Sequence, residues 1–311
     1  MSRHPDRTGL SRRDLLRFGL GAAAGLIVSP SFAAVQSQHM RMIPKTGEPL
    51  PAIGLGTWQT FDVGTSSGER AGPREVLKQF AEQGGRVVDS SPMYGHAETV
   101  VGDLETELGL GGRLFLATKV WTTGRDAGIR QMETSFRRMR TQRMDLTQIH
   151  NLLDWKTHLR TLHEWKAQGR VRYIGITHYT ESAYDDLAQV MANEDIDFVQ
   201  FNYSILSRAA ERRLLPLAQQ KQIAVLVNKP FETAGLFARV RGRPLPPWAA
   251  DIDCRSWAQY FLKFILGHPA VTAVLPATAK PQHLLDNMQA GLGRLPDAAL
   301  RERMADYLQR L

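Results

Sequence analysis

Four polar residues in this chain have the types and the spacing needed to reduce a carbonyl group. Asp89, Lys119 and His150 each end an apolar run of strand length, and Tyr94 lies five residues after Asp89. Side chains at the same end of successive parallel strands converge at the carboxyl-terminal face of a closed barrel. The spacing therefore predicts that these four side chains meet in one pocket.

Carbonyl reduction needs a hydride on carbon and a proton on oxygen, so a protein must hold a hydride donor and supply a general acid. A tyrosine is a weak acid at its usual pKa of about 10. A lysine ammonium beside the phenol lowers that pKa, and a carboxylate keeps the ammonium charged. Tyr94, Lys119 and Asp89 fit these roles, and His150 could orient the carbonyl oxygen or relay the proton.

Each of the four residues also has a structural interpretation when it is taken singly. A buried Asp-Lys pair is often only an ion pair, a histidine at a strand end often bonds to a backbone carbonyl, and a tyrosine before glycine can simply pack. Their joint placement at one expected barrel face favours an active site.

Short apolar runs alternate with helical patterns along the chain. Strands are predicted over 52–56, 86–89, 114–118, 144–149, 172–176, 197–201, 223–227 and 271–275. Helices are predicted over 73–83, 97–108, 127–140, 155–168, 181–192, 208–220, 253–266 and 280–291. These are roughly eight strand-helix units, the number in an α/β (β/α)8 TIM barrel.

Further segments lie around these units. A short β-hairpin over 40–53 precedes them and is expected to plug the amino-terminal end of the barrel, and an additional helix is expected over 296–311. The segment 228–251, rich in proline and glycine, is too long for an ordinary connection, and such loops are usually functional or disordered. With no linker to divide it, 34–311 is predicted to be a single barrel domain.

The first 33 residues have the features of an export signal. The twin arginines Arg12 and Arg13 precede a weakly apolar stretch, 18–28, and the small-x-small sequence Ser31-Phe32-Ala33. This order predicts a twin-arginine (Tat) signal peptide over 1–33, the Tat export machinery as a partner and a periplasmic or exported location. The apolar stretch is shorter than the roughly 20 residues of a membrane span, so no stable span is expected after cleavage.

Composition and charge exclude other classes of protein. The 311 residues are 43% hydrophobic and 23% charged, which is typical of globular chains. The net charge is +8, but five arginines and two aspartates precede residue 34, which leaves +5 beyond them. The remaining basic residues do not run together, so no nucleic-acid partner is expected. The single cysteine, Cys254, offers neither a disulfide nor a metal cluster, and no metal is predicted.

Several motifs, in order, resemble one known family. They are Gly54-Leu55-Gly56-Thr57-Trp58, Val88 to Gly95, Ala117 to Trp121, Met144 to His150, Gly169 to Gly175, Gln200 to Ser204, and Leu275-Pro276 followed by Asn287. With these motifs, residues 41–292 resemble the aldo-keto reductases. The resemblance implies a (β/α)8 barrel that binds NADPH, with NADH possible, and no Gly-rich GxGxxG motif follows a strand here.

The resemblance also assigns roles to residues. It implies Tyr94 as the general acid, Lys119 and Asp89 as the groups that tune its pKa, and His150 as part of the substrate pocket. The cofactor-binding positions to which it points are Gly56, Thr57, Thr177, His178, Gln200, Asn228, Lys229, Pro230, Thr278, Lys280, His283 and Asn287.

Three of these regions depart from the common family pattern. Thr177-His178 stands where a Ser-Asn pair usually binds the nicotinamide carboxamide, and Asn228 replaces a tyrosine that stacks on the nicotinamide ring. Ala277 and His283 stand where many members have the lysine and arginine that bind the 2'-phosphate. His178 and Lys229 could instead contact a phosphate or the substrate, or face solvent.

The predicted function is transfer of a hydride from NAD(P)H to a small aldehyde or ketone. Trp58 and Trp121 follow strands at the same face, where indole rings form either walls of a substrate pocket or packing at the barrel mouth. A non-catalytic nicotinamide-binding or redox-sensing exported module is the alternative. An unrelated barrel hydrolase would need a metal cluster or a carboxylate pair at the strand ends, and only Asp89 is there.

Overall fold

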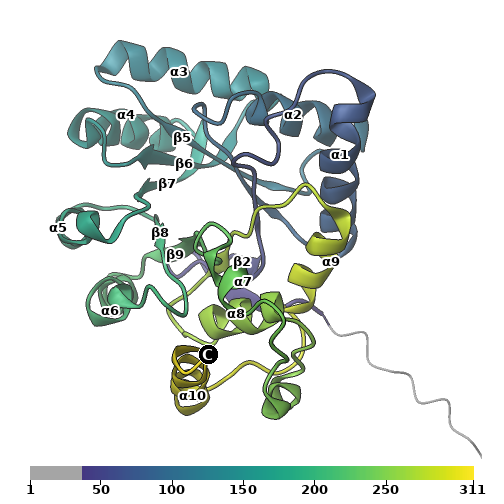
Figure 1. Ribbon diagram of the computed structural model, residues 1–311. Coiled ribbons are helices and arrows are strands. Elements are labelled where there is room, and N and C mark those ends of the chain that lie inside the picture. The colour runs from purple at the N-terminus through teal and green to yellow at the C-terminus, as the bar shows by residue number, and fades with distance from the viewer. Residues whose placement is uncertain (1–36) are drawn as a thin grey trace, which may run out of the picture. The chain divides into compact units, whose positions relative to one another are not determined.

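The computed structural model describes residues 37–311, and its centre is a parallel sheet of eight strands in the order β10-β9-β8-β7-β6-β5-β4-β3 (Figure 1). Parallel bridges from Ile53 to Val274 and from Gly56 to Ala277 join the two edges of this sheet. The sheet therefore closes on itself, and the predicted (β/α)8 barrel is confirmed.

The elements follow the predicted alternation closely. The strands are β1 (Met40–Met42), β2 (Pro49–Pro51), β3 (Leu55–Gly56), β4 (Val87–Asp89), β5 (Phe115–Val120), β6 (Met144–His150), β7 (Val171–Thr177), β8 (Phe198–Asn202), β9 (Ala224–Asn228) and β10 (Ala273–Val274). The helices are α1 (Ser67–Glu82), α2 (Ala97–Glu107), α3 (Arg125–Arg138), α4 (Trp155–Ala167), α5 (Tyr184–Asn193), α6 (Leu214–Gln220), α7 (Gly235–Arg239), α8 (Trp257–Leu266), α9 (Pro281–Gln289) and α10 (Ala298–Gln309).

Alternate residues of the strands face opposite sides of the barrel wall. On β5, Phe115 belongs to the apolar cluster inside the barrel, whereas Leu116 belongs to the cluster between barrel and helices. Because strand side chains alternate between two faces, Lys119 points inward like Phe115, four residues earlier. By the same rule Asp89 and Gln148 point inward from β4 and β6. The apolar inside of the barrel thus ends in a polar layer at the carboxyl ends of the strands.

The hairpin closes the other end of the barrel, as predicted. β1 and β2 pair antiparallel. Ile43, in the turn between them, and Leu50, on β2, are fully buried and belong to the same inner cluster as Phe115 and Phe198. The amino-terminal end of the barrel is therefore filled by side chains of the hairpin.

Helix α1 begins at residue 67, six residues before the predicted start. Ser66 accepts a hydrogen bond from the backbone N–H of Glu69, and the Glu69 carboxylate accepts one from the N–H of Ser66, which forms a capping box. Pro73 lies inside the helix. The helix therefore continues through the residue at which the predicted helix, 73–83, began.

Other segments also differ in detail from the expected elements. The single helix expected over 208–220 is a 3-10 turn, Ala209–Arg212, followed by α6. The long loop over 228–251 contains the short helix α7 and the start of the 3-10 segment Pro247–Ile252. This loop therefore contains two short helical segments.

The additional carboxyl-terminal helix, α10, is present and is fixed to the barrel by Arg301. This side chain is 7% exposed, and its guanidinium donates to the Phe264 carbonyl oxygen at 2.9 Å and to Glu211 Oε1 at 2.5 Å. It also bonds the hydroxyl of Tyr203 on the β8–α6 connection. Removing one member of a buried ion pair is costly because the other member is left buried without its partner.

We expect Arg301→Ala to lower the free energy of unfolding by about 2 kcal/mol, because Glu211 and the Phe264 carbonyl lose a charged donor. Urea unfolding followed by circular dichroism measures this change. The control is Arg303→Ala, which removes an exposed cation-π contact with Trp248 and should cost less than about 1 kcal/mol. Equal effects of the two substitutions would contradict the docking role of Arg301.

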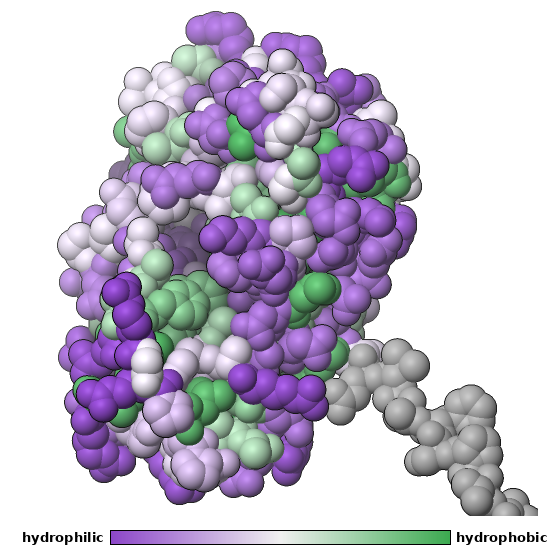
Figure 2. All heavy atoms as spheres, turned by 45° about the vertical axis from the view of Figure 1, so that its right-hand side comes forward, coloured by the Kyte–Doolittle hydropathy of each residue, from purple (hydrophilic) through white to green (hydrophobic). Residues whose placement is uncertain are grey.

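Two findings concern the surface and the membrane. On the face in Figure 2, hydrophobic residues occur in small scattered groups among hydrophilic ones. Among residues 37–311, no helix has both the length and the apolar character needed to cross a bilayer. The predicted signal peptide over 1–33, and the start of the barrel domain at 34, lie outside the described residues.

Candidate active site

A buried ion pair lies under the mouth of the barrel, meaning the carboxyl-terminal end of its strands. Lys119 is fully buried, and its Nζ donates to Asp89 Oδ2 at 2.6 Å and to the Ser90 carbonyl oxygen at 2.8 Å. Burial acts to lower the pKa of Lys119, but the charge and hydrogen bonds of Asp89 and Tyr94 outweigh it, and the pKa is raised. Lys119 is therefore an ammonium at neutral pH.

Tyr94 lies above this pair, in the turn that follows β4. Its ring centroid is 5.0 Å from Lys119 Nζ and 5.9 Å from the His150 ring, which it meets edge to face. Burial raises the pKa of the Tyr94 hydroxyl more than the Lys119 ammonium lowers it. The net shift is opposite to the one expected from Lys119 alone, so the phenol holds its proton more firmly than a free tyrosine. A protonated phenol is the form that can donate.

His150, at the end of β6, is held in its neutral form. Its Nδ1 lies 3.1 Å from Ser91 Oγ, and its ring centroid is 6.4 Å from that of Trp121. Burial, followed by the positive charges of Lys119 and His178, lowers its pKa to about 3. A neutral imidazole can donate one hydrogen bond to a carbonyl oxygen, which fits the orienting role expected for His150.

The lowered pKa of His150 makes folding stability depend on pH. Above the unfolded pKa of about 6.5, His150 is neutral in both states and its contribution is fully present. Below it, the unfolded chain takes up a proton that the folded site refuses until about pH 3, so stability is lost as pH falls. From pH 7 to pH 5, wild type should lose about 2 kcal/mol more than His150→Gln, as measured by urea unfolding. An equal loss of stability in wild type and in His150→Gln between these two pH values would contradict the lowered pKa of His150.

Two glutamines join the ion pair to the far side of the barrel. Asp89 Oδ1 accepts hydrogen bonds from Gln148 Nε2 at 3.0 Å and from Gln200 Nε2 at 3.1 Å. Asn228 Nδ2 in turn donates to Gln200 Oε1 at 3.2 Å. The Asp89 carboxylate is therefore fixed through both of its oxygens.

Sequence reasoning assigned no role to Gln148 or Ser91. Both lie inside motifs that had been noted, and Gln148 is two residues before His150, so it must face the same side of β6. The available signal for Gln148 was its polar side chain at an inward position of the buried strand β6. Ser91 gave no such signal, because its contact with His150 spans 59 residues.

The predicted cofactor positions at strand ends lie around this network. Thr57, which follows Gly56, is fully buried, and its Oγ1 and backbone N–H both donate to the Asp89 carbonyl oxygen. Thr177 ends β7, and the backbone N–H of His178 donates to the Gln200 carbonyl oxygen. The structure thus brings these residues and Asn228 together at the mouth.

Other predicted cofactor positions lie in two neighbouring segments. Lys229 and Pro230 begin the loop after β9, where Lys229 Nζ is 5.2 Å from the ring centroid of Tyr179. Lys280 is the residue at the N-cap of α9. Its backbone N–H donates a hydrogen bond to the hydroxyl of Thr278. His283 and Asn287 follow on α9, the first exposed and the second buried. This segment is bridged to β3, so it lies beside the ion pair and not within its hydrogen-bond network.

The two predicted substrate residues are exposed indoles at the mouth. Trp58 follows β3 and is 45% exposed, and Trp121 follows β5 and is 40% exposed. A residue that packs internally would be covered, so this exposure does not fit internal packing and leaves both indoles available to contact a ligand.

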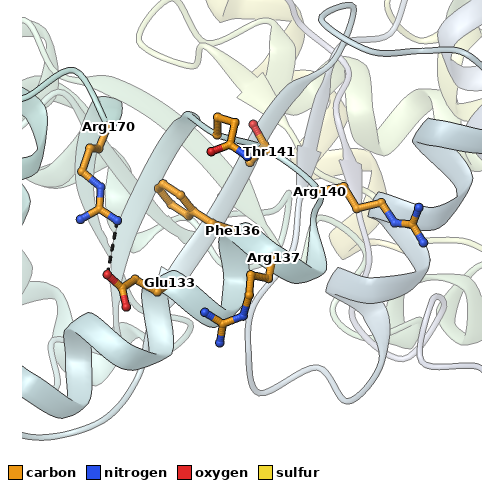
Figure 3. A pocket seen from close by; sticks show the side chains of 7 residues that line it. Glu133, Phe136, Arg137, Arg140, Thr141 and Arg170 are labelled. Atoms are coloured by element: carbon orange, nitrogen blue, oxygen red, sulfur yellow. Dashed lines mark ion pairs between the residues drawn. The ribbon is translucent and has the colours of Figure 1, made fainter.

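A surface hollow elsewhere does not have the features of an active site. It lies between the end of α3 and the segments that lead into β6 and β7, away from the mouth (Figure 3). Arg170 points to Glu133, with 3.5 Å between guanidinium and carboxylate, and Arg140 extends away to pair with Asp103. Glu133, the one carboxylate among the described residues that line the hollow, is thus already paired, and the hollow lies away from the Asp89–Lys119 pair, which leaves the barrel mouth as the candidate site.

The structure is a (β/α)8 barrel with the Asp89–Lys119 pair, Tyr94 and His150 at its mouth, and comparison with known proteins identifies the family. The chain belongs to the Aldo/keto reductase family, whose model matches residues 52–303. It is 30% identical over 260 residues to the methylglyoxal reductase YeaE of Escherichia coli K12, covering 80% of this chain and 88% of that protein.

Two further relatives bear on the cofactor. An NADH-specific methylglyoxal reductase of Escherichia coli K12 is 25% identical, with 87% of this chain and 100% of that protein covered. The crystal structure of an aldo/keto reductase from Klebsiella pneumoniae with NADP and acetate has a TM-score of 0.71 at 26% identity, covering 86% of this chain and 95% of that one. Relatives thus use either form of the nicotinamide cofactor.

Proposed function

We propose that this protein reduces the carbonyl group of a small aldehyde or ketone with NADPH, Tyr94 being the general acid. The observation that carries the proposal is the buried ammonium of Lys119, bonded to Asp89 and lying 5.0 Å from the ring of Tyr94 at the barrel mouth. Methylglyoxal, the substrate named for several relatives, is a small aldehyde of the kind proposed.

The residues at the mouth fit a nicotinamide cofactor. Asn228 Oδ1 is a buried acceptor without a hydrogen-bond partner among residues 37–311, and the carboxamide of a nicotinamide carries the matching donor. Lys280 offers a positive charge for a 2'-phosphate, which supports NADPH, although NADH is used by one relative. When bound, the cofactor supplies the hydride.

The residues of the chain then have separate tasks. Tyr94 donates its proton to the carbonyl oxygen as negative charge develops there, and the Lys119 ammonium stabilises the phenolate that remains. Asp89 holds Lys119 in place and keeps it charged. Neutral His150 donates a hydrogen bond that orients the carbonyl oxygen, with Ser91 holding its other ring nitrogen.

We also propose that a twin-arginine signal over 1–33 exports the protein. The support is the order of Arg12-Arg13, the apolar stretch and the Ser31-Phe32-Ala33 site. Replacing both arginines by lysine should keep the protein in the cytoplasm, as measured by cell fractionation. Unchanged fractionation would contradict the proposal.

The test of the activity uses the purified full chain with NADPH, and separately NADH, and a panel of methylglyoxal, aliphatic and aromatic aldehydes. We expect the absorbance of NADPH to fall on addition of an aldehyde. Binding of NADPH without turnover of any carbonyl would favour a nicotinamide-binding module, and absence of binding would exclude both. The complete set of four groups at one mouth favours the enzyme.

A further inference from the structure

The mouth of the barrel contains a side-chain amide whose two halves are used unequally. Asn228 ends β9, and its Nδ2 donates to the Gln200 Oε1 and to the His178 carbonyl oxygen, each at 3.2 Å. Its Oδ1 is buried and has no partner among residues 37–311. Rotating the side-chain amide of Asn228 by half a turn would place Oδ1 against these two acceptors. The two hydrogen bonds therefore fix the orientation of the amide.

Gln200, one of the predicted cofactor-binding residues, has its own amide already engaged. Its Nε2 donates to Asp89 Oδ1 at 3.1 Å and to Gln148 Oε1 at 3.3 Å, and its Oε1 accepts from Asn228. Those bonds hold the charged pair in place and would be broken if Gln200 turned to a ligand. Among the linked amide side chains of Gln148, Gln200 and Asn228, the acceptor that has no hydrogen bond within the described part of the chain is therefore Asn228 Oδ1.

We propose that Asn228 Oδ1 accepts a hydrogen bond from the carboxamide N–H of the nicotinamide, and so selects cofactors that carry a carboxamide. This inference rests on the proposed function. An aromatic side chain at this position would contact the face of the ring, whereas an amide oxygen recognises a donor on its edge. A buried acceptor left unpaired is unfavourable, so a ligand that supplies the donor binds more tightly.

The buried state of Oδ1 has a structural consequence. The oxygen is covered from water, whereas Asn228 as a whole and Lys229 are half-buried and begin the loop after β9. A ligand donor therefore reaches Oδ1 only after a small shift of the side chains around it. Lys229 has a left-handed backbone, with φ at 51°, directly after Asn228.

Asn202 provides a matched control. It ends β8, its Cα is the register partner of Asn228, and its Oδ1 is also buried without a partner among residues 37–311. No hydrogen bond within that range joins its side chain to Gln200 or Asp89. The two asparagines therefore differ chiefly in their connection to the ion pair.

The experiment compares NADP⁺ with its 3-acetylpyridine analogue, which keeps the ring carbonyl but lacks the N–H donor. Dissociation constants are measured by calorimetry for wild type, Asn228→Ala and Asn202→Ala. Wild type should bind NADP⁺ about tenfold more tightly than the analogue, since one donor is lost and Oδ1 stays unpaired. Asn228→Ala should bring this ratio to about one, and Asn202→Ala should leave it as in wild type.

The ratio distinguishes recognition from general damage. Binding of 2',5'-ADP, which has no nicotinamide, should be the same in all three proteins and so reports an intact fold. A wild-type ratio near one, an unchanged ratio in Asn228→Ala, or a ratio lost in Asn202→Ala would each overturn the proposal. If wild type binds 2',5'-ADP and neither nicotinamide form, the proposed function fails as well.

Discussion

Replacing Tyr94 by phenylalanine should lower kcat for aldehyde reduction by about 10²- to 10⁴-fold, the usual contribution of a general acid. Phenylalanine keeps the ring against His150 and Lys119 but has no proton to give. The affinity for NADPH, measured by fluorescence titration, should stay within about twofold, because only the hydroxyl is removed and the ring that shapes the site is kept.

The matched control for this substitution is Tyr179→Phe, the same chemical change at an exposed ring. Tyr179 stacks on His178, with ring centroids 5.5 Å apart, and this stacking does not need the hydroxyl. Its kcat should therefore be close to that of wild type. Turnover by Tyr94→Phe at the wild-type rate would remove Tyr94 from the proposed role.

Replacing Lys119 by methionine should damage both stability and turnover. The Asp89 carboxylate would stay buried with only two amide donors, and breaking a buried ion pair from one side costs about 3–5 kcal/mol. Reduction should slow as strongly as in Tyr94→Phe, because no ammonium stabilises the phenolate. Urea unfolding and steady-state kinetics measure the two effects.

The double variant Asp89→Asn with Lys119→Met separates these effects. It removes both charges while keeping similar shapes, so much of the lost stability should return. Activity should not return, since the ammonium is still absent. If the double variant recovers turnover, the pair is structural and the tyrosine works without it.

Most of the fold could be predicted from local pattern. Apolar runs of strand length that end in a polar residue identified β4, β5 and β6, and predicted that Asp89, Lys119 and His150 lie at one mouth. The hairpin was predicted by turn residues between two short runs, and Ile43 and Leu50 fill the barrel end as expected.

What could not be predicted depends on contacts between distant residues. The network from Asp89 through Gln200 to Asn228 joins strands up to 139 residues apart in sequence. The net pKa shift of Tyr94 depends on how deeply the barrel buries the ring, since burial and Lys119 act in opposite directions. The early start of α1 depends on the side chain of Ser66 facing its own helix.

The hairpin that fills the amino-terminal end of the barrel also constrains how protons reach the site. With Ile43 and Leu50 packed into the inner cluster, apolar side chains fill the barrel between the hairpin and the ion pair. In the proposed reaction, a proton lost by Tyr94 can be replaced from bulk water only by way of the mouth. A bound product obstructs that route, so Tyr94 should regain its proton only after the product has left. Reprotonation of Tyr94 should therefore be observed with the rate constant of product release.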